Sequence, residues 1–482
     1  MVNLKIVLKT LGFLLLVEVF FMLVALVVAI LYKEPDSKAF LLSALISMGA
    51  GTFAVVSFRN AKKEIGKREG FIIVSLVWVV FSLFGSLPYL FSGSIPSFTD
   101  AFFETMSGFT TTGSSILNNI EALPHGILFW RSMTQWIGGM GIIVLSLAIL
   151  PLFGIGGMQL FAAEVPGPTP DKLNPKISQT AKNLWGIYVL FTVTETLLLW
   201  MGGMSFFDAV NHSFTTMATG GYSTKQANIA FWDSAYIQYV IIFFMFLAGT
   251  NFSLSYCALT GRFKKVFANE EFKYYILFII GFTVLIFSGL LISTQLGVEK
   301  SFRDALFQVV SIITTTGFST VDYLQWQPIL VMLIFALFFF GGSAGSTGGG
   351  IKIMRIVLLM KNSYYELRRM VHPNAIVPVR FNKHAVPEQI ITNVLAFFMF
   401  YFIVFFLSTI IFTLFEPDLA SSMGAVATSL GNIGPGLGNV GPAENFAYIA
   451  PFGKWFLSFL MLLGRLELFT VLVLFSPAFW KK

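Results

Sequence analysis

The amino-acid sequence predicts an all-α integral membrane protein, in which four pseudo-repeated helix, pore-loop, helix units surround one pore and follow an N-terminal helix pair. Three observations lead to this prediction: the composition, a set of hydrocarbon-length segments, and a fourfold internal repeat. Of the 482 residues, 56% are hydrophobic and 11% are charged, and the mean hydropathy is +0.79. This apolar content exceeds that of soluble domains, so the composition favours a membrane protein.

The polar residues argue against several other classes of protein. The single cysteine, Cys257, cannot form an internal disulfide, and it does not combine with the four histidines in any zinc-ligand spacing. The formal net charge of +7 could indicate nucleic acid binding. However, the basic residues cluster in short loops at the expected membrane edges, so we expect membrane lipid and no nucleic acid as a partner.

Ten segments are long and apolar enough to cross a hydrocarbon core, which takes about 20 residues per helix. The first segment is too long for the core of a signal peptide and no small-residue cleavage site follows it, so we expect a helix there as well. The ten expected helices cover residues 8–31, 39–58, 70–91, 127–150, 184–202, 235–259, 273–293, 328–359, 390–414 and 453–475.

These helices divide the chain into an N-terminal two-helix hairpin and four pore units. The third unit contains a glycine-rich intramembrane loop at residues 341–350. The expected divisions are 1–69 for the hairpin, 70–180 for pore unit 1, 181–268 for pore unit 2, 269–385 for pore unit 3 and 386–482 for pore unit 4.

The distribution of basic residues predicts the orientation. Ten crossings place both termini on one side of the membrane, and 23 of the 31 basic residues lie on that side. The opposite loops carry five basic residues against thirteen acidic ones. By the positive-inside rule, both termini are expected to be cytoplasmic.

The internal repeat has a constant length. Three copies begin with Asp-Ala and end in glycine: "DAFFETMSGFTTTG" at 100–113, "DAVNHSFTTMATGG" at 208–221 and "DALFQVVSIITTTG" at 304–317. A fourth copy, "SSMGAVATSLGNIG" at 421–434, has the same length without the Asp. We expect the first residue of each copy to cap a short helix of about ten residues, or about 15 Å, that ends at the membrane midplane.

The end of such a half-helix has a chemical consequence. The chain must turn back with unpaired backbone carbonyls, which a membrane tolerates only where protein buries them or water hydrates them. Four such turns around one axis would offer rings of carbonyl oxygens that can replace the water shell of a cation. Small residues also mark close helix packing, and a single "TTTG" would fit that explanation. Four copies in register favour pore loops.

At this point the sequence resembles a known family. The fourfold unit, the stretches "TTTGSS", "TTTGFST", "GGYST" and "GNIGPGLG", the glycine-rich "FFFGGSAGSTGGGIK" and the late "LLGRLELFT" are similar to those of TrkH-type subunits in the Trk, Ktr and HKT potassium-transport superfamily. The resemblance covers essentially the whole chain. The two extra N-terminal helices favour the TrkH branch over the shorter Ktr type.

The resemblance implies a set of filter residues. The family's filter glycines fall on Gly113, Gly317 and Gly434, and in the second loop on Gly221 or its neighbour Gly220. Because the four loops differ, fewer matched carbonyl sites are expected than in a symmetric potassium filter, and discrimination against sodium should be incomplete. The carbonyls that would bind potassium belong to Thr110, Thr111 and Thr112, to Ala218, Thr219 and Gly220, to Thr314, Thr315 and Thr316, and to Gly431, Asn432 and Ile433.

Two features on the cytoplasmic side of the expected filter point to a gate. Six of the ten residues at 341–350 are glycine, so the helix over 328–359 must break there. A phosphate loop is excluded because Ile351 separates Gly350 from Lys352. The break either serves packing or forms a flexible constriction, and family resemblance supports the constriction. Its glycines are Gly341, Gly342, Gly345, Gly348, Gly349 and Gly350.

Arg465 is the second feature, because it lies near the middle of the last expected helix. A charge there costs about 2.5–3.5 kcal/mol or more unless it faces protein or water. Glu467 lies about 200° around the helix from it and cannot be its partner. Arg465 therefore either makes a structural salt bridge or carbonyl contact, or lines the inner pore and opposes cation passage; we favour the second.

The resemblance also implies a function. It implies potassium uptake across a bacterial inner membrane by a homodimer with one channel-like path per protomer, gated by a ring of TrkA-like cytoplasmic subunits that bind a nucleotide (NAD, ATP or ADP). Potassium is then the transported ion, and no organic cofactor is expected on this chain. An enzyme is disfavoured because no nucleophile with its base and no metal cluster is found in the sequence. Symport coupled to protons or sodium stays open, although carriers tend to have inverted repeats.

Overall fold

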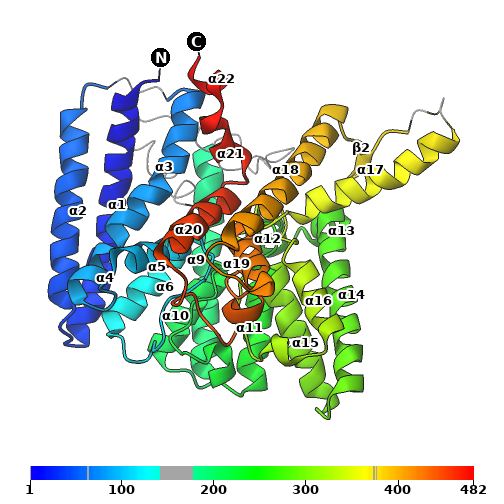
Figure 1. The fold of residues 1–482 in the computed structure, drawn as a ribbon, viewed down its shortest axis with the longest axis horizontal. Coiled ribbons are helices and arrows are strands. Elements are labelled where there is room, and N and C mark those ends of the chain that lie inside the picture. Colours follow the sequence, from blue (N-terminus) through cyan, green and yellow to red (C-terminus); the bar gives the residue numbers. More distant parts are fainter. Residues whose placement is uncertain are drawn as a thin grey trace.

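The computed structural model describes residues 2–61, 65–139, 141, 177–372, 375 and 377–481. The regular secondary structure of these residues is helical, apart from one antiparallel hairpin in which β1 (Arg380–Phe381) pairs with β2 (His384–Ala385) (Figure 1). The second half of the expected helix over 127–150 lies outside the described residues.

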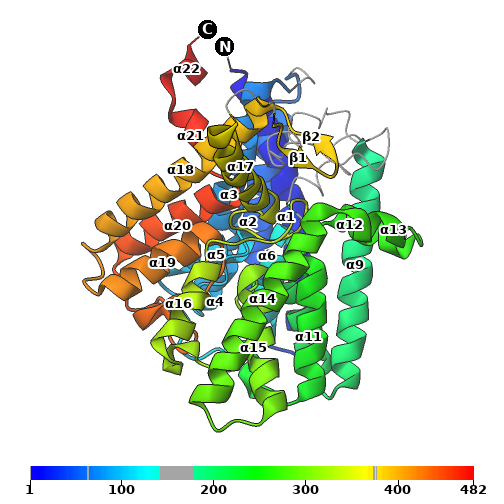
Figure 2. The ribbon, with the colours of Figure 1, turned by 90° about the vertical axis from the view of Figure 1, so that its right-hand side faces the viewer.

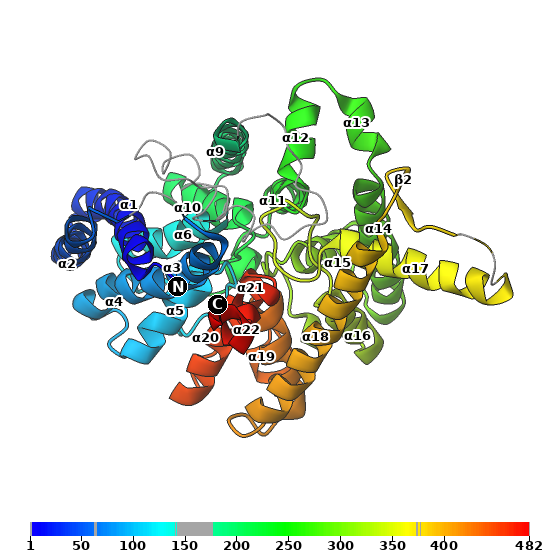
Figure 3. The same ribbon diagram turned by 90° about the horizontal axis from the view of Figure 1, so that it is seen from above.

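Two long N-terminal helices form a pair at one edge of the molecule. α1 (Leu4–Leu31) and α2 (Ser37–Ser57) run side by side (Figures 1 and 3). A side chain at Gly12 would approach the carbonyl oxygen of Gly51 to 2.9 Å, and one at Gly51 would approach that of Gly12 to 3.0 Å. Glycine thus lets the two backbones approach closely, as small residues do between membrane helices.

Four helix, loop, helix units follow along the chain. Seen from above, they succeed one another around a central region, with α3 to α6, α9 to α11, α14 to α16 and α18 to α20 in turn (Figure 3). The first two units contain α3 (Lys67–Gly85), α4 (Leu87–Ser92), α5 (Phe98–Phe109), α6 (His125–Gly139), α9 (Ile177–Met201), α10 (Phe206–Met217), η2 (Asn228–Phe231), α11 (Ala235–Ala248), α12 (Phe252–Leu259) and α13 (Phe263–Ala268). The last two contain α14 (Glu270–Ser293), α15 (Val298–Ile313), η3 (Tyr323–Gln325), α16 (Pro328–Leu337), α17 (Ile353–Val371), α18 (Glu388–Phe412), α19 (Leu419–Gly431), η4 (Gly438–Val440), α20 (Pro451–Arg465), α21 (Phe469–Leu472), η5 (Val473–Phe475) and α22 (Pro477–Trp480).

Six uninterrupted segments among the described residues are long and apolar enough to cross a membrane, and two bent helix pairs bring the number to eight. The remaining two expected helices correspond to α6, whose described part ends at Gly139, and to α16, which ends at Leu337 where the glycine-rich segment was expected to break it. These lengths and compositions are those of a multi-pass membrane protein.

Two helices that the sequence predicted as continuous are bent, and for these the prediction was wrong. The segment 235–259 turns by 109° between α11 and α12, where Gly249 lies against Thr314 and the side chain of Asn251 caps α12. The segment 453–475 turns by 109° between α20 and α21, where Glu467 and Leu468 have φ of 53° and 58°. A left-handed residue ends a helix, and apolar periodicity does not reveal one.

The caps of the short pore helices also differ from the expectation. The Oγ atoms of Ser97 and Ser205 accept the N–H groups of Asp100 and Asp208 at 3.4 and 3.0 Å, so the cap lies three residues before the predicted position. In the fourth copy Asp418 caps α19, and hydrogen bonds from Ser421 lower the pKa of its carboxyl. The third pore helix starts earlier, after Gly297. Serine or aspartate at the cap satisfies N–H groups that the helix leaves unpaired.

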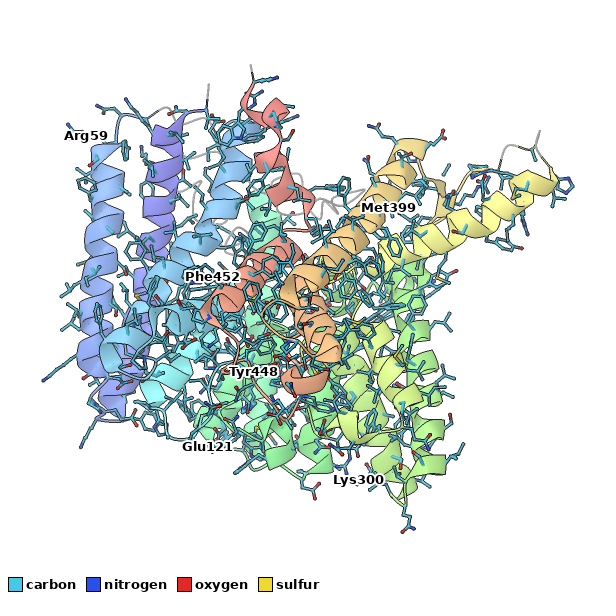
Figure 4. The ribbon with its side chains drawn as sticks, in the orientation of Figure 1. Arg59, Glu121, Lys300, Met399, Tyr448 and Phe452 are labelled. Atoms are coloured by element: carbon cyan, nitrogen blue, oxygen red, sulfur yellow. The ribbon has the colours of Figure 1, made fainter. Side chains whose placement is uncertain are left out.

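The two faces of the molecule carry different groups. Arg59 lies at the edge where both termini lie, whereas Glu121 and Lys300 lie at the opposite edge (Figure 4). On the side of the termini, α17 projects away from the four units, and the β hairpin lies beside it (Figures 1 and 2).

Candidate functional site

The four loops that follow the pore helices share one backbone conformation. We name them loop 1 (110–116), loop 2 (218–224), loop 3 (314–320) and loop 4 (431–437). In each loop, two residues separated by one other have positive φ, the first a Thr or Asn and the second a glycine. The angles are 55° and 84° at Thr111 and Gly113, 53° and 75° at Thr219 and Gly221, 58° and 81° at Thr315 and Gly317, and 53° and 97° at Asn432 and Gly434.

The repeated conformation distinguishes the two adjacent glycines of loop 2. Gly221 has the positive φ of the other three loops, while Gly220 donates its N–H to the carbonyl of Thr215 at 2.8 Å. The equivalent N–H in loop 1, from Thr112, reaches Ser107 at the same distance. Gly220 thus matches Thr112, and Gly221 matches Gly113.

The four glycines close a ring. A Cβ atom on each would meet the carbonyl oxygen that precedes the glycine of the next loop, so only glycine allows the backbones to come this close. The contacts run in chain order and return to the start. They join Gly113 to Gly220 O, Gly221 to Thr316 O, Gly317 to Ile433 O and Gly434 to Thr112 O.

The carbonyl oxygens at this ring differ in their partners. Within the described part of the chain, no N–H or O–H group donates to the carbonyls of Thr112, Thr316 or Ile433. The carbonyl of Gly220 accepts from Nε2 of Gln135 at 2.7 Å. Buried carbonyls normally have partners, so unpaired ones at a ring are groups that water or a cation can occupy.

Pairs of threonine hydroxyls lie within hydrogen-bond distance of each other in loops 1 and 3. The Oγ1 atoms of Thr110 and Thr112 lie 2.8 Å apart, and so do those of Thr314 and Thr316.

On the outer side of the ring, a cavity of about 70 Å³ is lined by the four glycines and by residues that include Arg131 and Tyr222.

The glycine segment (341–350) lies directly against the inner side of the loops. The N–H of Gly349 donates to Oγ1 of Thr315 at 2.7 Å, and Oγ1 of Thr347 donates to the carbonyl of Met217 at 3.0 Å. A Cβ at Gly348 would approach the carbonyl of Thr314 to 2.8 Å. Of the six predicted gate glycines, Gly341, Gly342, Gly348, Gly349 and Gly350 are buried, and Gly345 is exposed.

Arg465 is the last residue of α20 and reaches the glycine segment. Its guanidinium donates to the carbonyl of Thr347 at 2.8 Å, to Oγ1 of Thr111 at 3.1 Å, and to the carbonyls of Gly138 and Gly139 at 2.6 and 3.1 Å. As the helical geometry predicted, Glu467 is not its partner; it pairs with Arg355. Arg465 thus joins the glycine segment, loop 1 and the end of α6.

Two charged residues that contact the glycine segment were not predicted as parts of the site. Oε1 of Glu271 accepts the N–H of Ala344 at 2.7 Å and that of Met354 at 3.2 Å. Nζ of Lys352 donates to the carbonyl of Gly348. These contacts hold both ends of the segment, and no spacing in the sequence relates Glu271 to a loop more than 70 residues away.

A second group was missed behind loops 1 and 2. Arg131 on α6 is 2% exposed and pairs with Glu104 on α5. Gln135, one turn later on α6, contacts loop 2. A charge inside an apolar helix was the available signal, since such residues face protein and are functional by default.

Comparisons with known proteins place the chain among transporters. A family model described as TrkH, cation transport protein, matches residues 36–482. The chain is 43% identical over 469 residues to the Trk system potassium uptake protein TrkH of Escherichia coli K12, covering 96% of each. It is 40% identical over 483 residues to the protein of the same name from Halomonas elongata, covering 100% of each. It also resembles the crystal structure of the potassium transporter TrkH from Vibrio parahaemolyticus, with 38% identity and a TM-score of 0.90 over 99% of this chain and 100% of that one.

Proposed function

Because the chain belongs to the TrkH family of cation transport proteins, we propose that it takes up potassium across a bacterial inner membrane through a channel-like, potassium-selective pore. One observation carries the proposal: four loops of the same backbone conformation meet glycine to carbonyl in a closed ring. Carbonyl oxygens in such a ring can replace the water shell of a cation. The names of the relatives, which are potassium uptake proteins, support potassium as the transported ion.

In this proposal the ring is the selectivity filter. Potassium passes along the carbonyls of the four loops, with Gly113, Gly221, Gly317 and Gly434 at the turns. The Gly220 carbonyl accepts a hydrogen bond, whereas no donor to the other three ring carbonyls is found in the part of the chain that the structure describes, so the site is not fourfold symmetric. Discrimination against sodium is then real but incomplete. The remaining filter carbonyls are those of Thr110, Thr111 and Thr112, Ala218 and Thr219, Thr314, Thr315 and Thr316, and Gly431, Asn432 and Ile433.

The glycine segment and Arg465 form the gate below the filter. The segment contacts Thr315 and Met217, and the guanidinium holds its Thr347 carbonyl. The segment obstructs the path, and the positive charge of Arg465 opposes the next cation. Its bonds to backbone carbonyls do not cancel that charge, because carbonyls carry only dipoles.

A TrkA-like cytoplasmic ring that binds a nucleotide opens this gate, and the chain works as a homodimer. The words "Trk system" in the names of the relatives support a system of several components. α17 continues directly from the glycine segment and projects from the body, with Arg368 and Arg369 in its last turn (Figure 1). A partner that moves α17 could therefore pull on the segment mechanically.

The positive-inside distribution supports cytoplasmic termini and a cytoplasmic α17. Arg59 lies at the edge of the termini in Figure 4, as this orientation requires. The proposed parts of the chain are the hairpin 1–69 and the pore units 70–180, 181–268, 269–385 and 386–482.

The decisive experiment separates a channel from a symporter. The protein is reconstituted in planar bilayers, and the reversal potential is measured under a potassium gradient at several external pH values and sodium concentrations. A channel gives a reversal potential that follows potassium and does not change with pH; a weak dependence on sodium reports incomplete selectivity. A reversal potential that shifts with external pH, or that fits only a fixed ratio of sodium to potassium, would show symport in place of a channel.

A further inference from the structure

We propose that the buried pair of Arg131 and Glu104 is a positioning pair that holds the backbone of loops 1 and 2 in register and thereby sets the selectivity of the pore. The proposal rests on the proposed filter and adds residues that do not contact the permeating ion. It comes from the contacts of one cluster, which consists of Glu104, Arg131, Gln135 and Tyr222.

Arg131 connects α6 to both loops. Its Nε lies 2.6 Å from Oε1 of Glu104, and its Nη1 donates to the carbonyl of Ser223 in loop 2 at 2.8 Å. Its guanidinium also lies over the ring of Tyr222, 3.6 Å from the centroid. A planar guanidinium can donate in several directions while it stacks, which lysine cannot do.

Glu104 connects this charge to loop 1. Its Oε1 accepts from Oγ of Ser115 at 3.0 Å, and its Oε2 accepts the N–H of Ile116 at 3.0 Å. Glu104 is fully buried, so its carboxylate depends on these donors and on Arg131. The pair therefore ties the outer end of loop 1 to that of loop 2.

Two neutral side chains extend the cluster to the ring itself. Gln135 donates to the carbonyl of Gly220 at 2.7 Å and accepts the N–H of Tyr222 at 3.1 Å. The hydroxyl of Tyr222 donates to the carbonyl of Glu104 at 2.8 Å and lies 3.3 Å from that of Ser114. Gly220 supplies the carbonyl that Gly113 faces, so the cluster holds both sides of the contact between loops 1 and 2.

The position of the pair indicates a role beyond stability. A buried ion pair often contributes little net stability compared with apolar residues of the same size, because both charges lose their water. What it does provide is a defined geometry, since its hydrogen bonds are directional. Residues 114 and 222 directly follow the ring glycines, so a shift of the cluster moves the ring carbonyls.

The equivalent residues of the other copies do not repeat the pair. Glu104 is the fifth residue of its copy, and the fifth residues of the second, third and fourth copies are His212, Gln308 and Ala425, none of them a carboxylate. His212 lies 2.9 Å from Oγ of Ser223, within its own loop. Gln308 reaches Thr320 at 3.4 Å, within its own loop. We therefore expect the contact between loops 1 and 2 to depend on a charged brace, whereas loop 4 is tied to the chain that follows loop 3 by a neutral group, the hydroxyl of Tyr323, which donates to the carbonyl of Gly436 at 2.7 Å.

The test compares Glu104→Gln, Arg131→Gln and the double variant in vesicles, with rubidium and sodium flux measured per folded protomer after gel filtration. Both single variants are expected to lower the ratio of rubidium to sodium flux by about tenfold. A change of this size corresponds to the free energy of about one hydrogen bond. The flux ratio of the double variant should fall by less than the product of the two single effects, because both substitutions remove the same interaction. Arg131→Lys should restore part of the ratio.

A matched control and a second readout keep the result interpretable. Arg303 on α15 is also a buried arginine, paired with exposed Glu299, so Arg303→Gln should leave the flux ratio unchanged. The pair could instead act only through its charge. Glu104→Gln would then lower the entry of both cations at low salt, and Arg131→Gln would raise it. Such opposite effects of the two variants would overturn the proposal. Tyr222→Phe removes one hydroxyl only and is expected to lower the ratio less, about threefold; this variant serves if the charge variants fail to fold.

The outcomes also separate this proposal from the proposed filter. If Gly113→Ala lowers the flux ratio while the well-folded Arg131 and Glu104 variants keep the native ratio, the positioning pair is refuted and the filter stands. If Gly113→Ala also keeps the native ratio, the filter itself lies elsewhere and the pair loses its premise.

Discussion

Loops 1 and 2 differ from loops 3 and 4 in what holds the same backbone in place. Behind the first two loops lies a buried ion pair that binds both of them. Loop 3 is held by its own helix, through Ser311 Oγ, which donates to the carbonyl of Phe318 at 2.6 Å. Loop 4 is held by Asn432, whose amide donates to Oγ1 of Thr112 at 2.9 Å and to the carbonyl of Met461 at 3.0 Å.

The parts of the gate contact different loops. Gly349 of the glycine segment packs against loops 3 and 4, at Thr315 and Gly431, whereas loop 1 is contacted from below by Arg465. Loops 1 and 2 are thus braced by a buried ion pair, while the gate reaches both halves of the ring: its glycine segment contacts loops 3 and 4, and Arg465 contacts loop 1. Identical backbone geometry therefore does not require identical support, and substitutions in the two halves should have different consequences.

The largest effect is expected where the two halves are alike, at the ring glycines. Gly113→Ala and Gly317→Ala place a side chain against the carbonyls of Gly220 and Ile433, and a left-handed conformation costs a non-glycine residue about 1–2 kcal/mol before any clash. Both variants, like the corresponding Ser variants, should lose at least about tenfold in the ratio of rubidium to sodium flux while remaining in the membrane.

Gly93→Ala is the matched control, because Gly93 has a φ of 72° but, apart from its chain neighbours, no described residue has an atom within 4 Å of the Cβ position. Its flux ratio should stay native. Native ratios in both ring variants would mean that the ring does not select ions.

The second prediction concerns the gate. Arg465→Ala, or deletion of residues 346–348, should raise rubidium uptake without the cytoplasmic partner by about tenfold, because each removes part of the barrier. Combining the two should give less than the summed effect, since the bond from Arg465 to Thr347 is lost in both.

A purely structural role of Arg465 predicts the opposite sign, because unpaired buried carbonyls would destabilise the protein and lower the flux. Flux per folded protomer distinguishes the two roles. Uptake at background level from Arg465→Ala, with a normal folding yield, would refute the gate.

A smaller effect is expected from the brace of loop 4. Asn432→Gly keeps the left-handed conformation but removes the amide contacts with Thr112 and Met461, at a cost of about 1 kcal/mol per hydrogen bond. The flux ratio should fall by a few fold, less than for the ring glycines. Asn432→Ala also places an alanine in the left-handed conformation, so its flux ratio should fall further. Equal flux ratios in the two variants would show that the backbone angle at residue 432 does not affect selectivity.

The smallest effect on basal flux is expected on α17. Replacing Arg368 and Arg369 with Ala should reduce the response to the cytoplasmic partner more than it reduces flux without the partner, since both residues lie far from the ring. The pair Arg262→Ala and Lys264→Ala removes the same charge at the corner between α12 and α13 and serves as the control. An equal loss of partner response in both double variants would mean that α17 acts only through general charge.

Much of the architecture could be predicted because it repeats along the chain. Hydrocarbon-length apolar runs and the positive-inside distribution need no knowledge of contacts, and the constant interval from Asp100 to Gly113 marks every loop. The break at the glycine segment was predicted as well, because six glycines in ten residues cannot sustain a helix. The interval pointed to Gly221 but left its neighbour Gly220 open, and the backbone angles give Gly221 the conformation of the other three glycines.

The sequence by itself therefore determined the class of protein, the number of repeats and the positions of the turns, since these depend on local composition and periodicity. Only the tertiary structure decided the 109° bends after Ala248 and Arg465, the serine caps and the partners of Arg131, Glu271 and Arg465. The physical reason is that apolar character and glycine content act on the chain locally. A charge inside the fold, in contrast, is satisfied by whichever donor or acceptor the folded chain brings within about 3 Å, even from more than 300 residues away, as with Arg465 and the hydroxyl oxygen of Thr111.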